Sequence, residues 1–219
     1  MNTTWYIPAP TLRAIAAPPA GSSLLLLMRH SVRGDIPANE SGFDVPLLPE
    51  GHRLARELGA EIGPRLGSLH TSPVLRCVDT AHAVAAGAGS AVTPVMDRLL
   101  GDPGAFVEDG RTAAATWRTH GHEAVMTALV TSTRLPGLAD GLDATRRLVA
   151  HMRAASGERP GVHVFVTHDS LVTAAASHCL GLPLTANDWP YYLEALALVL
   201  EEGGVLAFYR DRTGRVPWA

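Results

Sequence analysis

The apolar run Leu24–Met28 constrains the fold of this 219-residue chain more than any other feature. It is continuous rather than alternating, which is typical of a strand buried on both faces of a sheet. Val162–Thr167 has the same character, and shorter strands are predicted at Ser68–Thr71 and Ala91–Val95. Helical patterns separate these runs, at 50–66, 74–86, 112–156 and 169–180. This alternation predicts a three-layer α/β/α sandwich with a mostly parallel central sheet.

The ends of the chain and its middle are predicted with different detail. Residues 1–22 are rich in Pro and Ala and are interpreted as an irregular lead-in. The 112–156 region is predicted to form two helices that separate at 134–137. Two final strands, 192–200 and 205–209, are predicted to form a hairpin that turns at 201–204. We therefore expect one domain over 1–219, with a small helical cap inserted at about 97–140.

Composition excludes several classes of function. All 18 basic residues are Arg, so a phosphate-binding loop with its Lys and a Schiff base to pyridoxal phosphate are both excluded. A net charge of -3 gives no reason to expect a nucleic-acid partner. Cys77 and Cys179 have no metal or redox spacing and are expected to be core residues. No signal peptide or span-length apolar segment is found, so we expect a cytoplasmic protein without a membrane partner.

Unusual polar residues occur where three predicted strands end. The first strand leads into Arg29, His30 and Arg33; the second leads into a helix whose first turn holds Arg76. The third leads into His168-Asp169. Open α/β sheets bind ligands at the carboxyl ends of their strands, so these side chains converge if the three strands are neighbours.

These residue types suit phosphoryl transfer. Three guanidinium groups can neutralise a dianionic phosphoryl group, and a helix N-terminus at Arg76 adds to the attraction. A neutral imidazole can attack phosphorus and hold the phosphoryl group covalently. A carboxyl group can protonate the leaving alcohol and later activate water.

The motifs resemble those of the histidine phosphatase superfamily. Arg29-His30-Ser31-Val32-Arg33 is similar to its Arg-His-Gly-x-Arg signature. Thr71-Ser72-Pro73-x-x-Arg76-x-x-x-Thr80-Ala81 and Thr167-His168-Asp169 are similar to its later segments, in the same order. The resemblance spans residues 24–210 and implies a phosphoglycerate mutase-like fold and a phosphatase that works through a phosphohistidine.

The resemblance also implies roles for individual residues. His30 matches the nucleophile, and the phosphate pocket is matched by Arg29, Arg33, Arg76 and His168. Acid phosphatase-like members take the proton donor from an Asp after the second His, which is Asp169 here. Mutase-like members take it from a Glu after the third strand, and Asp102 stands at that position. We favour Asp169, with Asp102 as the first alternative and Glu108 as a further one.

The expected reaction is the hydrolysis of a phosphomonoester, with a phosphorylated small molecule as the substrate. Neither a metal nor an organic cofactor is expected, and His120-Gly121-His122 is interpreted as a solvated loop. The alternatives are a protein phosphohistidine or phosphoserine phosphatase, a mutase-like phosphotransferase and a non-catalytic phospholigand-binding module. A homodimer is compatible with the sequence. Ser31, in place of the usual Gly, is expected either to narrow the pocket or to offer its hydroxyl to the phosphate or to His30.

Overall fold

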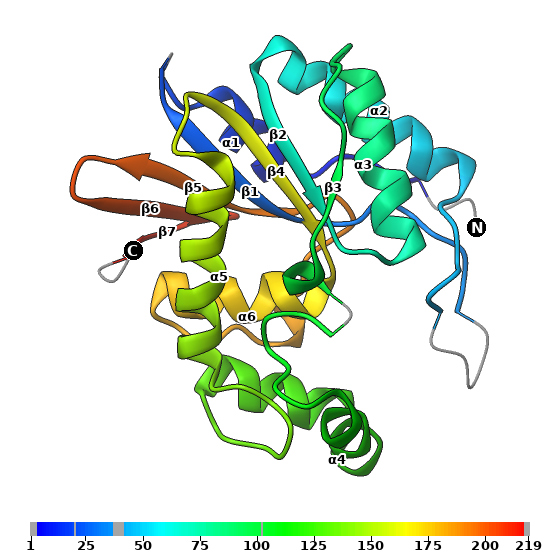
Figure 1. Cartoon of the computed structure of the whole chain (residues 1–219), viewed down its shortest axis with the longest axis vertical. Helices are drawn as coiled ribbons and strands as arrows, with labels where there is room; N and C mark the ends of the chain where they lie inside the picture. The colour runs from blue at the N-terminus through cyan, green and yellow to red at the C-terminus, as the bar shows by residue number, and fades with distance from the viewer. Residues whose placement is uncertain (1–3, 20, 37–41, 102, 217–219) are drawn as a thin grey trace.

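A computed structural model describes residues 4–19, 21–36, 42–101 and 103–216 of the chain. Its central sheet has seven strands in the order β3-β2-β4-β1-β5-β6-β7 (Figure 1). The strands are β1 (Ser23–Arg29), β2 (Leu66–Thr71), β3 (Val95–Met96), β4 (Gly161–Thr167), β5 (Ala195–Glu201), β6 (Gly204–Tyr209) and β7 (Arg212–Val216). Pairs from β3 to β1 are parallel, and pairs from β1 to β7 are antiparallel. Because β6 follows two antiparallel steps, it runs in the direction of β1, and the predicted mostly parallel sheet is confirmed.

Helices cover both faces of the sheet, as the three-layer prediction requires (Figure 1). One face is covered by α1 (Ala9–Ala16), α2 (Pro49–Ile62) and α3 (Leu75–Gly87). The other is covered by α4 (Gly110–Thr131), α5 (Gly141–Ser156) and α6 (Asp169–Leu180). Short 3-10 turns occur at η1 (Gly63–Arg65), η2 (Arg98–Leu100) and η3 (Ala186–Asp188).

Strand β1 lies between the two halves of the core. Leu24, Leu26 and Met28 belong to the core under α1, α2 and α3, whereas Leu25 and Leu27 belong to the core under α4, α5 and α6. All five side chains are buried, which confirms the prediction of a strand with two buried faces. Its neighbours are β4 and β5, so its carboxyl end lies inside the sheet and not at an edge.

Three sequence predictions at the ends of elements are wrong. The lead-in contains α1, because Pro10 is tolerated in the first helical turn and because Thr11 and Ile15, four residues apart, are buried on one side. Of the predicted 91–95 strand only Val95 pairs with β2, and the pairing continues to Met96, beyond the predicted range. Strand β5 begins at Ala195 instead of 192, since Leu193 has a positive φ of 61°.

The C-terminal strands form the antiparallel part of the sheet, and they include one strand that the sequence did not predict. The 201–204 turn joins β5 to β6 as predicted. The apolar β5 strand lies between β1 and β6 and is not an edge strand. The edge position is taken by β7, which sequence reasoning missed because Arg212–Val216 carries two arginines and a glycine instead of an apolar pattern.

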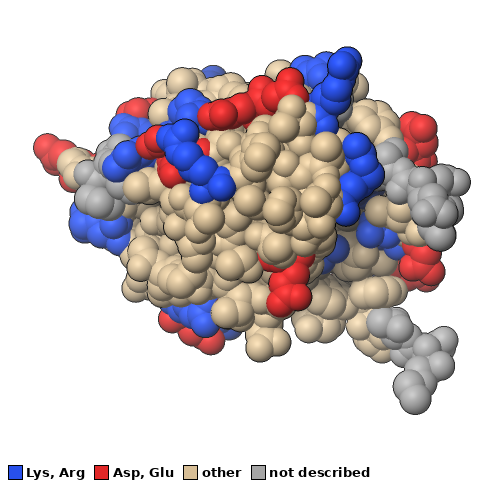
Figure 2. All heavy atoms as spheres, turned by 90° about the horizontal axis from the view of Figure 1, so that it is seen from below, with Lys and Arg blue, Asp and Glu red and all other residues tan. Residues whose placement is uncertain are grey.

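The middle of the chain contains the predicted pair of helices. The first ends at Thr131, and the second begins at Gly141. The first of them, α4, is kinked at Gly121, whose φ of 76° is not helical. It packs against α6 through Val125, Met126 and Leu129. The assignment of 97–140 as a cap stays a prediction. Seen from the α4 side, basic and acidic side chains are scattered around a broad uncharged area (Figure 2).

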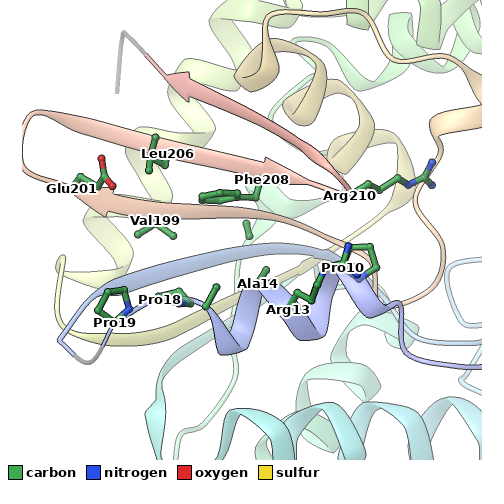
Figure 3. Close-up of a pocket in the computed structure, with 12 residues that line it drawn as sticks. Pro10, Arg13, Ala14, Pro18, Pro19, Val199, Glu201, Leu206, Phe208 and Arg210 are labelled. Atoms are coloured by element: carbon green, nitrogen blue, oxygen red, sulfur yellow. The ribbon is translucent and has the colours of Figure 1, made fainter.

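An apolar groove of about 290 Å³ runs between α1 and the strands β5 and β6 (Figure 3). Ala14, Val199, Leu206 and Phe208 supply much of its wall, and Arg13 and Glu201 lie along its rim. None of the site residues predicted from the sequence lines this groove. Among the described residues, no helix is both long and apolar enough to cross a membrane.

Candidate active site

The three polar strand ends meet, because β2, β4 and β1 are consecutive in the sheet. His30 directly follows β1, and its backbone N–H donates to the Thr167 carbonyl at the end of β4 (2.9 Å). Arg76 lies in the first turn of α3, as predicted, and Asp169 is the first residue of α6. The N-termini of two helices therefore point toward the same place, and their free N–H groups and dipoles favour an anion there.

The His30 imidazole is almost fully buried, at 3% exposure, and its two nitrogens have different partners. Nδ1 lies 2.8 Å from the carbonyl oxygen of Ser31. Because a carbonyl only accepts, Nδ1 carries the proton and Nε2 has a free lone pair. Arg76 Nε donates to Nε2 at 3.0 Å, which requires the same tautomer. The ring therefore presents an unprotonated Nε2 to the guanidinium group.

Arg76 joins both histidines to the loop before α2. In addition to its bond with His30, Arg76 donates from Nη2 to His168 Nδ1 (3.2 Å) and from Nη1 to the Gly42 carbonyl (2.6 Å). Since His168 accepts at Nδ1, its proton is on Nε2, which donates to Ser72 Oγ at 3.1 Å. The two imidazole rings lie 5.7 Å apart, centre to centre. One guanidinium thus orients two neutral histidines.

Arg29 and Asp169 form an ion pair beside the histidines. The distance from Arg29 Nη2 to Asp169 Oδ2 is 3.1 Å, and both side chains are partly exposed. Arg29 Nη1 also donates to the Pro190 carbonyl (2.8 Å), and its guanidinium lies 4.2 Å from the ring centre of Tyr192. Asp169 Oδ1 accepts from the Ser170 N–H at 2.8 Å. The predicted proton donor is thus within reach of the predicted phosphate pocket.

Arg33 completes the cationic group. Its Nη1 donates to the Gly34 carbonyl (2.6 Å). Burial lowers the pKa of both Arg76 and His168, and the charge of Arg33 adds to both shifts. The Nε groups of Arg29 and Arg33 are buried and have no hydrogen-bond partner in the described part of the chain. Buried donors without partners are rare, and beside the guanidinium group of Arg76 these two N–H groups can donate to an added anion.

Burial and positive charge keep both histidines neutral. Burial lowers the pKa of His30 well below its ordinary value, and the charges of His168, Arg76 and Arg29 lower it further, against a smaller opposing effect of the Ser31 carbonyl. Burial, with a contribution from Arg76, lowers the pKa of His168 to about 4. Neutral His30 is the form that has a lone pair to offer to phosphorus.

The depressed pKa of His168 predicts that stability falls with acidity. In the unfolded chain the imidazole binds a proton below about pH 6.5, whereas the folded site resists it down to about 4. The unfolded state therefore binds more protons in this window, and unfolding becomes easier as pH falls through it. We expect His168 to account for about 2 kcal/mol of stability lost between pH 7.5 and 5. Urea unfolding at both pH values should show a smaller loss in His168→Gln than in the parent protein; an equal loss would contradict the assignment.

Ser31 does not act as expected from the sequence. Its hydroxyl donates to the Gly51 carbonyl in the first turn of α2 (2.8 Å), and its N–H donates to Thr80 Oγ1 (3.0 Å). Thr80 Oγ1 in turn donates to the Arg76 carbonyl (2.7 Å). The side chain therefore ties the loop after β1 to α2, and its hydroxyl donates to neither the predicted phosphate site nor His30. Thr80, part of the quoted motif, links the same loop to α3.

Sequence reasoning missed three further contributors. Ser72 holds His168 Nε2, although it was noted only as a helix-start residue of the motif. Gly101 has a φ of 150°, and a Cβ there would lie 2.6 Å from Ser72 Oγ and 2.7 Å from His168 Nε2, so only glycine fits. Tyr192 belongs to none of the quoted motifs, yet its ring lies 5.7 Å from the His30 ring.

Asp102 and Glu108 are the two alternatives to Asp169 as the proton donor. Asp102 lies outside the described residues. Glu108 is exposed, in the loop that precedes α4.

His70 lies near the strand ends. It stacks on Phe165 (4.8 Å between ring centres), and burial lowers the pKa of its imidazole. The cysteines Cys77 and Cys179 are free and buried, as predicted.

Comparisons with known proteins identify the family and the fold of the chain. The family model of the histidine phosphatase superfamily (branch 1) matches residues 25–202. Among solved structures, a phosphoserine phosphatase variant from Entamoeba histolytica has a TM-score of 0.60 at 14% identity, covering 86% of this chain and 97% of the other. A phosphoglycerate mutase from Bacillus anthracis has a TM-score of 0.58 at 14% identity, with coverage of 87% and 93%. A mycobacterial glucosyl-3-phosphoglycerate phosphatase has a TM-score of 0.55 at 22% identity, with coverage of 83% and 91%.

An α/β sheet with two histidines and three arginines at its strand ends thus defines a class of phosphoryl-handling proteins. The chain belongs to the histidine phosphatase superfamily. Its fold is phosphoglycerate mutase-like, and phosphatases and mutases both occur among the structures that share it. No curated protein sequence matches the chain.

Proposed function

We propose that this protein is a phosphatase that hydrolyses a small phosphomonoester through a phosphohistidine on His30. The observation that carries the proposal is the tautomer of His30. The Ser31 carbonyl holds the proton on Nδ1, so Nε2 is unprotonated, and its lone pair faces the guanidinium group of Arg76, from which it accepts a hydrogen bond. A phosphate-binding module would need the arginines, but it would have no use for a buried imidazole held neutral and oriented in this way.

The first step of the proposed reaction forms an N–P bond and breaks a P–O bond. The phosphoryl oxygens accept hydrogen bonds from Arg29, Arg33 and Arg76, whose positive charges offset the charge that develops in the transition state. The hydrogen bond from Arg76 Nε to His30 Nε2 breaks as the Arg76 guanidinium turns to the phosphoryl oxygens, and the freed Nε2 lone pair attacks phosphorus in line with the leaving oxygen. His168 turns its Nε2–H from Ser72 toward a phosphoryl oxygen and donates to it.

The second step releases phosphate and restores His30. Water attacks phosphorus, the N–P bond breaks, and the carboxylate that protonated the leaving alcohol takes a proton from the water. The arginines supply positive charge that a divalent cation supplies in other phosphatases, so the proposed reaction uses no metal.

Asp169 is our choice as the proton donor. Its carboxylate is paired with Arg29, a residue that we assign to the phosphate pocket. When the phosphoryl group enters, Arg29 can exchange the carboxylate for a phosphoryl oxygen. The carboxyl group is then left without its cationic partner, next to the phosphoryl group. Binding of the substrate thereby prepares the acid.

The proposal is tested by phosphate release. The protein should release inorganic phosphate from phosphorylated metabolites and from 4-nitrophenyl phosphate, and EDTA should leave the rate unchanged. Hydrolysis in the presence of sugar acids should not produce a second phosphate ester. Transfer to the acceptor instead of to water would identify a mutase-like phosphotransferase, and a large loss of rate with EDTA would identify a metal requirement.

The proton donor is tested by two matched variants. We expect Asp169→Asn to slow hydrolysis of an alkyl phosphate by 10²- to 10⁴-fold, the usual contribution of a general acid. A nitrophenyl ester needs little protonation of its leaving group, so its first step should be affected much less. Asp102→Asn is the matched control, in which both rates should change little. The assignment is wrong if Asp102→Asn is the variant that slows the alkyl phosphate selectively.

A further inference from the structure

Four aromatic residues form a continuous group beside the candidate active site, here called the aromatic wall: Trp5, Tyr6, Tyr191 and Tyr192. Trp5 lies 6.0 Å from Tyr191 and 5.6 Å from Tyr192, between ring centres. Tyr6 stacks on Tyr191 at 4.8 Å with an angle of 13° between the ring planes. Half of the wall therefore comes from the segment before α1, which precedes the residues 25–202 matched by the family model.

The inner end of the wall is part of the site. The Tyr192 ring lies 5.7 Å from the His30 ring, and the Arg29 guanidinium lies 4.2 Å from its centre. Arg29 also donates to the Pro190 carbonyl, which holds the 190–192 segment against the strand end. The N-terminal segment is held there as well, because Thr11 Oγ1 donates to the Leu193 carbonyl (3.0 Å). In Figure 1 the described chain before α1 reaches the side of the molecule where β2 ends.

The outer end of the wall is open. Tyr6 is 56% exposed although Tyr191 stacks on one of its faces. Steps of 5.7, 6.0 and 4.8 Å between ring centres lead from His30 through Tyr192 and Tyr191 to Tyr6. This is a series of aromatic surfaces that starts at the nucleophile and ends in solvent. A leaving group attached to phosphorus at His30 has to extend away from the buried imidazole, and the wall provides an apolar surface on that route.

We propose that the aromatic wall binds the leaving group and selects phosphomonoesters whose leaving group carries a flat aromatic ring, either a phenyl ring or a nucleobase. The proposal rests on the proposed phosphatase function. Offset stacking and edge-to-face contacts with tyrosine favour a flat π-system over a saturated ring of the same size. Exposed tyrosines also lose little conformational entropy on binding, because they have only two side-chain torsions.

The experiment compares substrates in two pairs whose leaving groups are primary alcohols of similar acidity. One pair is 2-phenylethyl phosphate and 2-cyclohexylethyl phosphate, and the other is adenosine 5′-monophosphate and ribose 5-phosphate. The bond that breaks is the same within each pair, so the ratio of kcat/KM values reports on the ring. We expect a preference of about tenfold for the aromatic member in at least one pair. The pair that shows it distinguishes a phenyl ring from a nucleobase.

Variants locate the source of that preference. Tyr6→Leu and Tyr191→Leu should lower the ratio several-fold, whereas Tyr6→Phe keeps the ring and should keep the ratio. Phe208→Leu is the matched control, because it removes a partly buried ring in the groove between α1 and β6. Thermal unfolding of each variant checks that it is folded.

The outcomes separate the inference from the function on which it rests. If the protein hydrolyses none of the four esters nor any other phosphomonoester, the proposed function fails. If it hydrolyses both members of each pair with equal kcat/KM, only the selectivity of the wall is overturned. The role of the aromatic wall is also overturned if the ratio of kcat/KM values is unchanged in both Tyr6→Leu and Tyr191→Leu, since the preference then comes from another part of the site.

Discussion

Replacing His30 with glutamine is expected to reduce phosphomonoester hydrolysis by at least about 10⁴-fold, the scale of loss seen when a covalent nucleophile is removed. Glutamine is polar and similar in length, so it can accept the hydrogen bond from Arg76 Nε in place of Nε2. It has no nucleophilic nitrogen, because the lone pair of an amide nitrogen is delocalised. The variant should therefore still bind phosphate while turnover is lost.

The loss should be accompanied by a missing intermediate. A substrate labelled on phosphorus, quenched in alkali during turnover, should leave label on the parent protein that acid removes, as expected of a phosphoramidate. His30→Gln should retain no label. His82→Gln is the control, because His82 is exposed on α3 and should keep both label and rate. An alkali-stable label that persists in His30→Gln would place the nucleophile at another residue.

Replacing Arg76 with alanine is expected to lower kcat/KM by about 10³-fold, at the upper end of what one preorganised charged donor contributes. The effect is large because Arg76 has two duties. It supplies positive charge to the phosphoryl group, and it orients the His30 and His168 rings through Nε and Nη2. Without it, each ring loses one of its two hydrogen bonds, and only the bonds to the Ser31 carbonyl and to Ser72 Oγ still orient the rings.

Arg76→Lys separates charge from geometry. Lysine restores a positive charge, but a single ammonium group cannot reproduce the planar fork that contacts two imidazoles and the Gly42 carbonyl. We expect it to recover less than a tenth of the lost kcat/KM, with inhibition by inorganic phosphate recovering more fully than kcat. Arg53→Ala, which removes an exposed arginine of α2, should change neither kcat/KM nor the inhibition by inorganic phosphate. Full recovery by lysine would mean that only charge matters at this position.

Local sequence patterns were sufficient to predict an element where the apolar pattern of a segment matches the faces that it buries in the structure. Leu24–Met28 predicted a strand with two buried faces because no polar residue interrupts it, and both cores do meet on it. The helical pattern at 74–86 predicted α3 and placed Arg76 in its first turn, where the structure has it. They failed where a segment is held by distant partners: α1 depends on Leu193, and β7 pairs with β6 without an apolar pattern of its own.

The candidate site shows the same division. Its residue types at the ends of three strands were sufficient to group His30, Arg29, Arg33, Arg76, His168 and Asp169, since the carboxyl ends of neighbouring parallel strands lie together. Which nitrogen of His30 is protonated depends on the Ser31 carbonyl, and the orientation of His168 depends on Ser72, which lies 96 residues before it. The first of these hydrogen bonds depends on the direction of a backbone carbonyl and the second joins two side chains that lie together only in the folded chain, so no spacing of residues encodes them.

The sequence by itself determined which chemical groups this chain can offer. Its histidines, arginines and carboxylate stand at the ends of predicted strands, and their positions can be read directly from the order of the residues. Only the tertiary structure decided how that chemistry is arranged. It directed the Ser31 hydroxyl to Gly51 and brought Tyr192 to His30. It also carried Trp5 and Tyr6 across the sheet to the edge of the site. The physical reason is that contacts between residues nearly 200 positions apart form only when the sheet and its two cores have brought them together.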